Sequence, residues 1–232
     1  MNKNKTLSQF ALVFFFCSIV FINNVQSQTP EKNWGIRLGL NAVSIKSFDA
    51  YYADEIIPDC SYKNKNGYFL TGFARFNFNR IFLQPEIAWN EYRRSCSFYS
   101  PVGNSDSYYP DIDLDIDSKA FNATFLAGYN IVHDYPFLFG VFFGTSFAGT
   151  YRTDYTMESR NSFSKTGFFL NYSGILGFSI NISKIYFDLR YEMCLTDNNK
   201  KLKDIPDFPE NYQNISFKYT EAILSFSFGV MF

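Results

Sequence analysis

The sequence has 232 residues, of which 21% are aromatic and 19% charged, with a formal net charge of -1. A chain without a basic excess lacks the electrostatic footprint of a nucleic-acid-binding protein, so we expect no nucleic-acid partner. The mean hydropathy is -0.15, and no long apolar run follows residue 27. This excludes a helical membrane protein but not a β-barrel, because only alternate residues of a barrel strand face lipid.

The N-terminus has the features of a secretory signal peptide. Lys3 and Lys5 give a positive start, residues 10–22 form an apolar run, and Val25 and Ser27 are compact residues at a cleavage position. The run of about 13 residues is shorter than the roughly 20 that a membrane-spanning helix needs. We therefore predict a cleaved signal peptide over residues 1–27 and one β-barrel domain over residues 28–232.

Eight segments of the remaining chain alternate between apolar and polar or small residues with period two, which is typical of strands. In the first, Trp34, Ile36 and Leu38 oppose Arg37 and Gly39. In chain order the predicted strands are residues 34–43, 68–78, 81–90, 120–131, 137–151, 168–180, 185–195 and 219–232. Pro85 lies inside the third strand and lacks a backbone N–H, so we expect a bulge or local break there.

Long and short connections alternate between these segments. The predicted long loops are residues 44–66, 91–119, 152–165 and 196–214, and the short turns lie near residues 79–80, 132–135 and 181–184. Outer-membrane barrels have long outer loops and short periplasmic turns, whereas a secreted β-sandwich, the competing class, has no reason to sort its loops by length. We predict an all-β fold: an eight-stranded, antiparallel, up-and-down transmembrane β-barrel with long outer loops and short periplasmic turns.

Aromatic residues are predicted to gather at the two edges of the membrane. Trp34, Phe78, Phe137, Phe187 and Phe232 fall near one edge, and the other has Tyr68, Trp89, Tyr151 and Tyr172. Two girdles are the expected interfacial pattern. Phe232 is the last residue and lies on the apolar face of the last strand, which predicts that it serves as an assembly signal for the barrel-assembly machinery.

Charged residues on the opposite strand faces are expected to lie inside the barrel and to form ion pairs, because an isolated charge in a narrow interior is costly. We expect Arg75 to pair with Glu86 across one hairpin, and Arg190 with Glu221 or Glu192. The network either fixes strand register as a salt-bridged plug or lines a narrow polar path for small solutes. Its predicted members are Arg37, Arg75, Glu86, Asp188, Arg190, Glu192 and Glu221.

No set of residues points to a catalytic, cofactor or metal site. His133 is the single histidine and is predicted to lie in a periplasmic turn, and no Gly-rich phosphate loop is present. Residues 111–117 place four aspartates on one face of an extended segment, about 6.8 Å apart, which is too far for one strand to chelate Ca²⁺. This segment is either a solvated outer strand extension or, with help from a second segment, a cation site.

Three cysteines remain after removal of the signal peptide, and they form no metal-binding spacing. Cys60 and Cys96 fall in predicted outer loops next to strands of one hairpin. The compartment is oxidising, so a disulfide between them can form if their Cα atoms lie within about 7 Å of each other. Cys194 is predicted to face inward on the seventh strand. Four loop tyrosines could either form an aromatic ligand-binding box or pack the loops together: Tyr51, Tyr52, Tyr108 and Tyr109.

The segment from Phe73 to Trp89, which contains ARF and LQPE, resembles the second hairpin of the PorT-like outer-membrane β-barrel family of Bacteroidota. Residues 188–192, DLRYE, are similar to the seventh strand of that family. The resemblance implies an outer-membrane location, with lipid, the barrel-assembly machinery and secretion or envelope proteins as partners. We expect a non-enzymatic role that is structural, adhesive or accessory to transport or secretion. The alternatives are a narrow porin-like channel or solute-binding barrel and, less favoured, a lipid-modifying enzyme.

Overall fold

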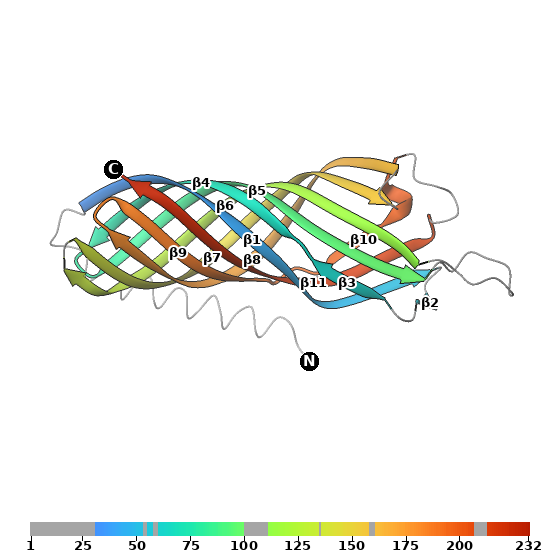
Figure 1. The fold of residues 1–232 in the computed structure, drawn as a ribbon, viewed down its shortest axis with the longest axis horizontal. Coiled ribbons are helices and arrows are strands. Elements are labelled where there is room, and N and C mark those ends of the chain that lie inside the picture. The colour runs from blue at the N-terminus through green and yellow to red at the C-terminus, as the bar shows by residue number, and fades with distance from the viewer. Residues whose placement is uncertain are drawn as a thin grey trace, which may run out of the picture.

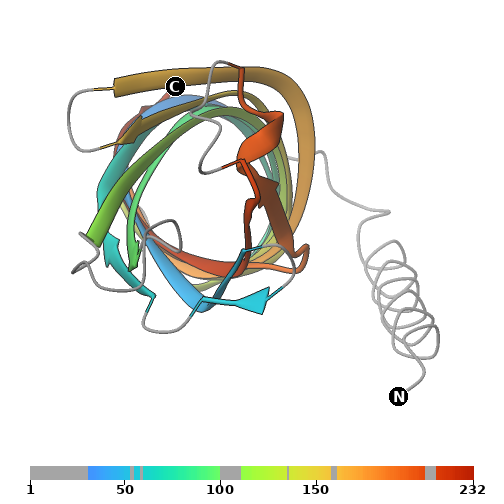
Figure 2. The same cartoon turned by 90° about the vertical axis from the view of Figure 1, so that its right-hand side faces the viewer.

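The chain forms an elongated, closed barrel of antiparallel strands, seen from the side in Figure 1 and along its axis in Figure 2. This computed structural model describes residues 31–52, 55–57, 60–99, 111–134, 136–157, 161–206 and 213–232. The predicted signal peptide and Tyr108 and Tyr109 lie outside the described residues. No helix in the described ranges is long and apolar enough to span a membrane.

Eight strands form the wall of the barrel: β1 (Glu31–Tyr52), β4 (Asn66–Phe78), β5 (Ile81–Tyr99), β6 (Asp111–Asp134), β7 (Phe137–Met157), β8 (Asn161–Ile182), β9 (Ile185–Cys194) and β11 (Ile215–Met231). Pairing of β1 with β11, from Gly35 with Met231 to Tyr52 with Ile215, closes the ring. The predicted eight-stranded antiparallel barrel is therefore confirmed. Short additional elements are β2 (Glu55–Ile56), β3 (Ser61–Asn64), β10 (Asn198–Lys201) and the 3₁₀ helix η1 (Leu202–Asp204).

Tight turns connect strands at one end of the barrel, which we call the turn end; the opposite end is the loop end. Asn79 and Ser183 have φ values of 56° and 57° in the β4–β5 and β8–β9 turns. Short hairpins need residues that tolerate the left-handed region, and asparagine does so readily. The β6–β7 turn is shorter than predicted: His133 still belongs to β6 and pairs with Leu138.

The break expected at Pro85 is present. The ladder between β4 and β5 includes Phe73 with Glu86 and Phe76 with Leu83, but the positions between them are not paired. The register is the same on both sides, so the ladder is interrupted without a bulge. Pro85 itself is paired with Phe125 of β6, and the sheet continues through that side.

Several strands extend well beyond their predicted ends, all toward the loop end. β5 continues to Tyr99, β6 starts at Asp111, β7 continues to Met157 and β8 starts at Asn161. Much of the predicted loops 91–119 and 152–165 is therefore strand, and we call these parts of β5, β6, β7 and β8 the loop-end extension. The apolar-outside pattern stops near Trp89 because the outer face of the extension carries polar residues such as Arg93 and Ser97, while apolar residues turn inward.

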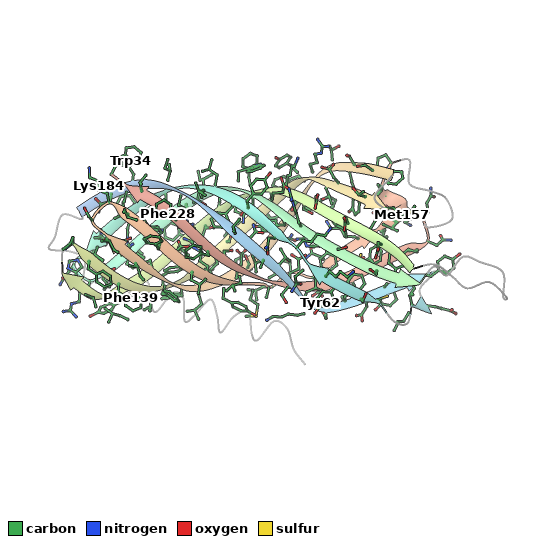
Figure 3. All side chains as sticks on the ribbon, viewed as in Figure 1. Trp34, Tyr62, Phe139, Met157, Lys184 and Phe228 are labelled. Carbon is green, nitrogen blue, oxygen red and sulfur yellow. The ribbon has the colours of Figure 1, made fainter. Side chains whose placement is uncertain are left out.

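Nearer the turn end, the barrel surface is a broad apolar band. Its exposed side chains include Trp34, Ile36, Leu38 and Leu40 of β1, Phe121 and Phe125 of β6, Phe143 and Phe147 of β7, and Phe226 and Phe228 of β11. Figure 3 places Trp34, Lys184 and Phe228 near one end of the molecule and Met157 and Tyr62 toward the other. An outward apolar band around a closed sheet is the surface that a hydrocarbon solvent requires.

Aromatic contacts border this band on both sides. At the turn end the rings of Trp34 and Phe232 stack with centroids 4.6 Å apart. At the other border, the rings of Tyr68 and Trp89 lie 5.6 Å apart, and the indole N–H of Trp89 donates to the hydroxyl of Tyr151 over 2.9 Å. These contacts join members of the two predicted girdles.

Candidate functional site

The barrel interior behind the apolar band contains a compact ion cluster. Three strands contribute its members: Arg37 of β1, Glu86 of β5, and Asp188 and Arg190 of β9. Inward-facing positions on these strands alternate with the outward apolar band, so the strand period alone directs all four side chains into the lumen. Their side chains are 0–8% exposed. We call this group the ion cluster.

Glu86 is at the centre of the ion cluster. It accepts from Arg37 Nη2 over 2.8 Å, and its two oxygens accept from Arg190 Nη1 and Nη2 over 2.7 and 2.8 Å. The amide of Gln84 donates to it over 2.7 Å. Charge-assisted bonds of this kind offset the cost of burying a carboxylate.

Asp188 is the second carboxylate of the ion cluster. Its carboxylate accepts from Arg37, from Arg190 Nη2 over 2.7 Å and from the hydroxyl of Ser227 over 2.8 Å. Two arginines thus face two carboxylates, and every charge has at least two opposite contacts. Such an arrangement ties β1, β5 and β9 together through the lumen.

The expected pairing of Arg75 with Glu86 is wrong. Arg75 is fully buried, lies over the ring of Phe82 at 3.5 Å from the centroid and donates to the side-chain oxygen of Asn130 over 3.2 Å. Register explains the error, because Glu86 lies opposite Phe73. The guanidinium and the carboxylate therefore occupy different levels of the barrel, and Arg37 and Arg190 occupy the level of Glu86.

The expected pairing of Arg190 with Glu221 or Glu192 is also wrong. Glu221 pairs with Arg94 of β5, with Nη2–Oε2 and Nε–Oε1 distances of 2.8 and 2.5 Å. Glu192 accepts from the hydroxyl of Ser173. Arg94 was absent from the predicted network because it falls in a predicted loop. Continuing the β5 alternation through Tyr92 would have placed it inside.

A small polar cavity of about 30 Å³ separates these two charged levels. It is bordered by Glu86 and Arg190 on one side and by Tyr92, Asn122 and Glu192 on the other. The amide of Asn122 donates to the hydroxyl of Tyr92 over 2.8 Å. The space is sufficient for ordered water, which needs at least about 10 to 15 Å³.

The interior beyond Arg94 is apolar. Its buried side chains come mainly from β1, β5, β6, β7, β11 and η1, and include Ile45, Phe98, Leu114, Ile116, Tyr155, Met157, Leu202, Ile215 and Phe217. We call this group the loop-end core. Leu114 and Ile215 are completely buried. These apolar positions alternate with polar residues that face outward. The extension therefore has apolar side chains inside and polar side chains outside, whereas in the apolar band the apolar side chains face outward.

Cys60 and Cys96 both contact the loop-end core, and the Cys96 thiol donates to the backbone oxygen of Leu114 over 3.6 Å. Burial raises the pKa of Cys96 to about 12. The disulfide between the two cysteines stays a prediction. Cys194 contacts a separate group of buried residues that includes Tyr92.

The aspartates of residues 111–117 lie at the start of β6, as expected for an outer strand extension. Asp113 is exposed and accepts from the hydroxyl of Ser97, and Asp115 pairs with Lys65 over 2.7 Å. Within the described ranges, no three His, Cys, Asp or Glu side chains are close enough to hold a metal ion.

Residues 26–200 match the family model described as "Outer membrane protein beta-barrel domain". None of the curated proteins has a detectable sequence match. Among solved structures, OprG from Pseudomonas aeruginosa is similar with a TM-score of 0.56 and 13% identity, over 88% of this chain and 97% of that one. Ail of Yersinia pestis, the attachment invasion locus protein, matches 87% of this chain and 99% of its own at 15% identity and a TM-score of 0.39. At these identities the similarity concerns the fold.

Proposed function

The chain belongs to the outer-membrane β-barrel family, and from that premise we propose that it is a closed, non-conducting and non-enzymatic barrel that acts through its loop-end extension. Its role would be structural, adhesive or accessory to transport or secretion. In this family the loop end faces the cell exterior and the turn end faces the periplasm. The observation that carries the proposal is the loop-end core.

A solute channel needs a wettable mouth, but the loop end of this barrel is filled with apolar side chains. Leu114, Leu202, Ile215 and Phe217 are all at most 1% exposed. Opening a path through them would expose this surface to water, at roughly 25 cal/mol per Å². The extension is therefore built like the core of a globular domain, with its polar outer face available to partners.

The ion cluster supports the same proposal. An ion that crossed the lumen would have to displace Arg37, Glu86, Asp188 and Arg190 from mutual contacts whose side chains are 0–8% exposed. Removing one member of a buried ion pair leaves an uncompensated charge and costs several kcal/mol. The cluster is thus better suited to fixing the strands than to passing solute.

A narrow channel or solute-binding barrel is the second candidate, favoured by the polar cavity between the two charged levels. Its volume suits a water molecule but not a nutrient-sized solute. An enzymatic role has less support: Glu86 and Asp188 each accept hydrogen bonds from two arginines, so neither carboxylate is available as a general base.

Conductance in planar bilayers tests the proposal. We expect no stepwise current from the folded wild-type protein. The comparison variant should carry alanine at Phe98, Phe217 and Tyr219 together with alanine at all four members of the ion cluster, so that an opened barrel shows what the assay can detect. Reproducible current steps from the wild type would overturn the non-conducting role.

A partner search on intact cells addresses the accessory role. Photoreactive groups introduced at partly exposed, outward-facing positions of the extension, such as Ser97 and Thr156, should crosslink to a partner. The matched position at the turn end is Lys184. An accessory role predicts crosslinked species from the positions in the extension that are not seen from position 184.

A further inference from the structure

The wall of the barrel is split at the loop end between β8 and its neighbour. β8 has 22 residues, whereas β9 has 10 and its ladder with β8 ends at Ser173 and Cys194. The last contacts are the backbone N–H of Leu195 to the oxygen of Tyr172, over 2.9 Å, and Thr196 Oγ1 beside Asn171. Beyond them, no described strand pairs with residues 165–170 on the side away from β7.

Extra residues in the chain after β9 account for the split. β11 has two residues, Thr220 and Glu221, between its ladder with β9 and its ladder with β10, whereas the facing segment has four, residues 194–197. Because of these two additional residues, β10 pairs with β11 and lies, with η1, away from β8. Figure 2 shows the loop-end part of β8 curving outside the ring, with η1 on the inner side.

Side chains, not backbone, bridge the split. Lys165 of β8 pairs with Asp204 of η1 over 3.4 Å. Lys200 of β10 lies with its ammonium 4.3 Å from the centroid of the Phe169 ring, and Lys165 lies 5.3 Å from the same ring. Two lysines thus share one aromatic ring, and only Lys165 has a carboxylate within 4 Å among the described side chains.

The unpaired edge is also apolar and accessible. Phe168, Phe169 and Leu170 are 74%, 38% and 60% exposed. The wall parts again between β1 and β4 beyond Ala42, but there β2 pairs with the end of β1, and Ile57, which donates to the oxygen of Ala50, is 7% exposed. The β8 edge has no such cover in the part of the chain that the structure describes.

We propose that the edge of β8 over residues 165–170 is a docking site for an extended acidic segment of another protein, which would add a strand to the wall. The inference rests on the proposed function, since it names the partner class of the loop-end extension. An exposed strand edge offers backbone donors and acceptors, and side chains beside it set specificity. Carboxylates of the incoming strand would meet Lys165 and Lys200.

Charge argues for this occupant against a second copy of the same chain. Pairing two β8 edges would bring two further lysines to a place that already has an excess of positive charge, and like charges across strands are destabilising. Burial and the neighbouring cations Arg94 and Lys165 lower the pKa of Lys200 to about 8, in keeping with that excess. Lysine at a strand edge disfavours pairing with strands that lack negative charge. A strand with carboxylates would form ion pairs with the same lysines.

Hydrogen exchange with two matched peptides tests the site. The probes are a short peptide of alternating threonine and glutamate and one of alternating threonine and lysine, added to the folded barrel in lipid nanodiscs. We expect the threonine–glutamate peptide to slow amide exchange in residues 165–170. Replacing both lysines, Lys165→Glu with Lys200→Glu, should weaken its binding by about tenfold or more. Lys184→Glu at the turn end controls for the introduction of an acidic side chain away from the site.

Three outcomes would overturn the inference: no slowing at a saturating peptide concentration, equal binding of the two peptides, or an unchanged affinity in the double variant that folds normally. Protection of residues 165–170 without peptide, together with a dimer in sedimentation, would assign the edge to a second copy and overturn it as well. Bilayer current from the wild type bears on the proposed function alone, so the two failures can be told apart.

Discussion

Glu86 of β5 and Arg190 of β9 form a two-contact ion pair through the barrel lumen, with distances of 2.7 and 2.8 Å. The two strands are not neighbours, because β6, β7 and β8 separate them in the sheet. The pair therefore braces opposite parts of the wall.

We predict that Glu86→Ala destabilises the barrel by on the order of 3 to 5 kcal/mol, because it leaves Arg37 and Arg190 short of a carboxylate. A double-mutant cycle in urea unfolding from lipid vesicles should give a coupling energy between Glu86 and Arg190. The same cycle between Glu86 and Arg75 should be close to additive, since Arg75 contacts Phe82 and Asn130. Equal coupling in the two cycles would contradict the arrangement of the ion cluster.

The buried pair of Arg94 and Glu221, the second charged level, can be compared with the pair made by the preceding residue, Arg93. Arg94→Met leaves Glu221 buried without its partner and should cost about 3 kcal/mol, whereas removing both charges with Glu221→Leu should restore part of it. Arg93→Met breaks the pair with Glu91 on the outer wall. There the arginine side chain is 42% exposed, and the Glu91 side chain, 7% exposed, keeps its hydrogen bond from the hydroxyl of Tyr68. That change should cost at most about 1 kcal/mol, as surface ion pairs do.

Thiol counting decides the predicted Cys60–Cys96 disulfide. Denatured, unreduced mature protein should release one reactive thiol, from Cys194, if the bridge forms, and three if it does not. Counting on folded protein would mislead, because burial raises the pKa of Cys96 to about 12 and leaves little thiolate to react. A Cys60→Ser variant should give two thiols, which is a rise from one if the wild type has the bridge and a fall from three if it does not.

Phe232→Ala separates an assembly signal from a structural contact. The Phe232 ring stacks on Trp34, and each residue's backbone N–H donates to the other's oxygen. A recognition role predicts less assembled barrel in cells for Phe232→Ala but near-normal refolding in vitro, read as heat-modifiable gel mobility. Trp34→Ala removes the same stacking and is the control. If the two variants behave alike in cells, the contribution of Phe232 is structural.

Lys200 should make stability depend on pH. Its pKa in the folded protein is about 8, against an ordinary value of 10.5. Between these values the unfolded chain binds more protons than the folded one, so folding should become more favourable as the pH rises through 8 toward 10.5. Urea unfolding across this range should show the gain in the wild type and lose it in Lys200→Met; an identical pH profile in both would refute the assignment.

The two carboxylate pairings expected from sequence failed for different reasons. Across the β4–β5 hairpin, the two-residue turn at residues 79–80 sets the register and places Glu86 opposite Phe73, so Arg75 lies two residues nearer the turn; counting back from the predicted turn would have shown this. For Arg190, sequence patterns show which face a side chain occupies but not the level at which strands distant in the chain meet. Arg37 and Arg190, which hold Glu86, come from strands on other sides of the ring.

The strand ends toward the loop end failed for a different reason. Alternation continues through Tyr92, Arg94, Cys96 and Phe98, but the apolar residues switch from the outer to the inner face. A search for outward apolar residues therefore ends at the edge of the membrane band. The solvent changes there, and the same period-two pattern then describes a water-facing wall around an apolar core.

The sequence by itself determined the class of fold, the number of wall strands and the inward direction of the charged side chains. It could do so because period-two alternation and the order of long and short connections are local properties. Only the tertiary structure decided which charges pair, that the loop end is filled, and that β8 continues past β9. These depend on register, closure of the ring and the surplus residues after Cys194, which bring together strands far apart in the chain.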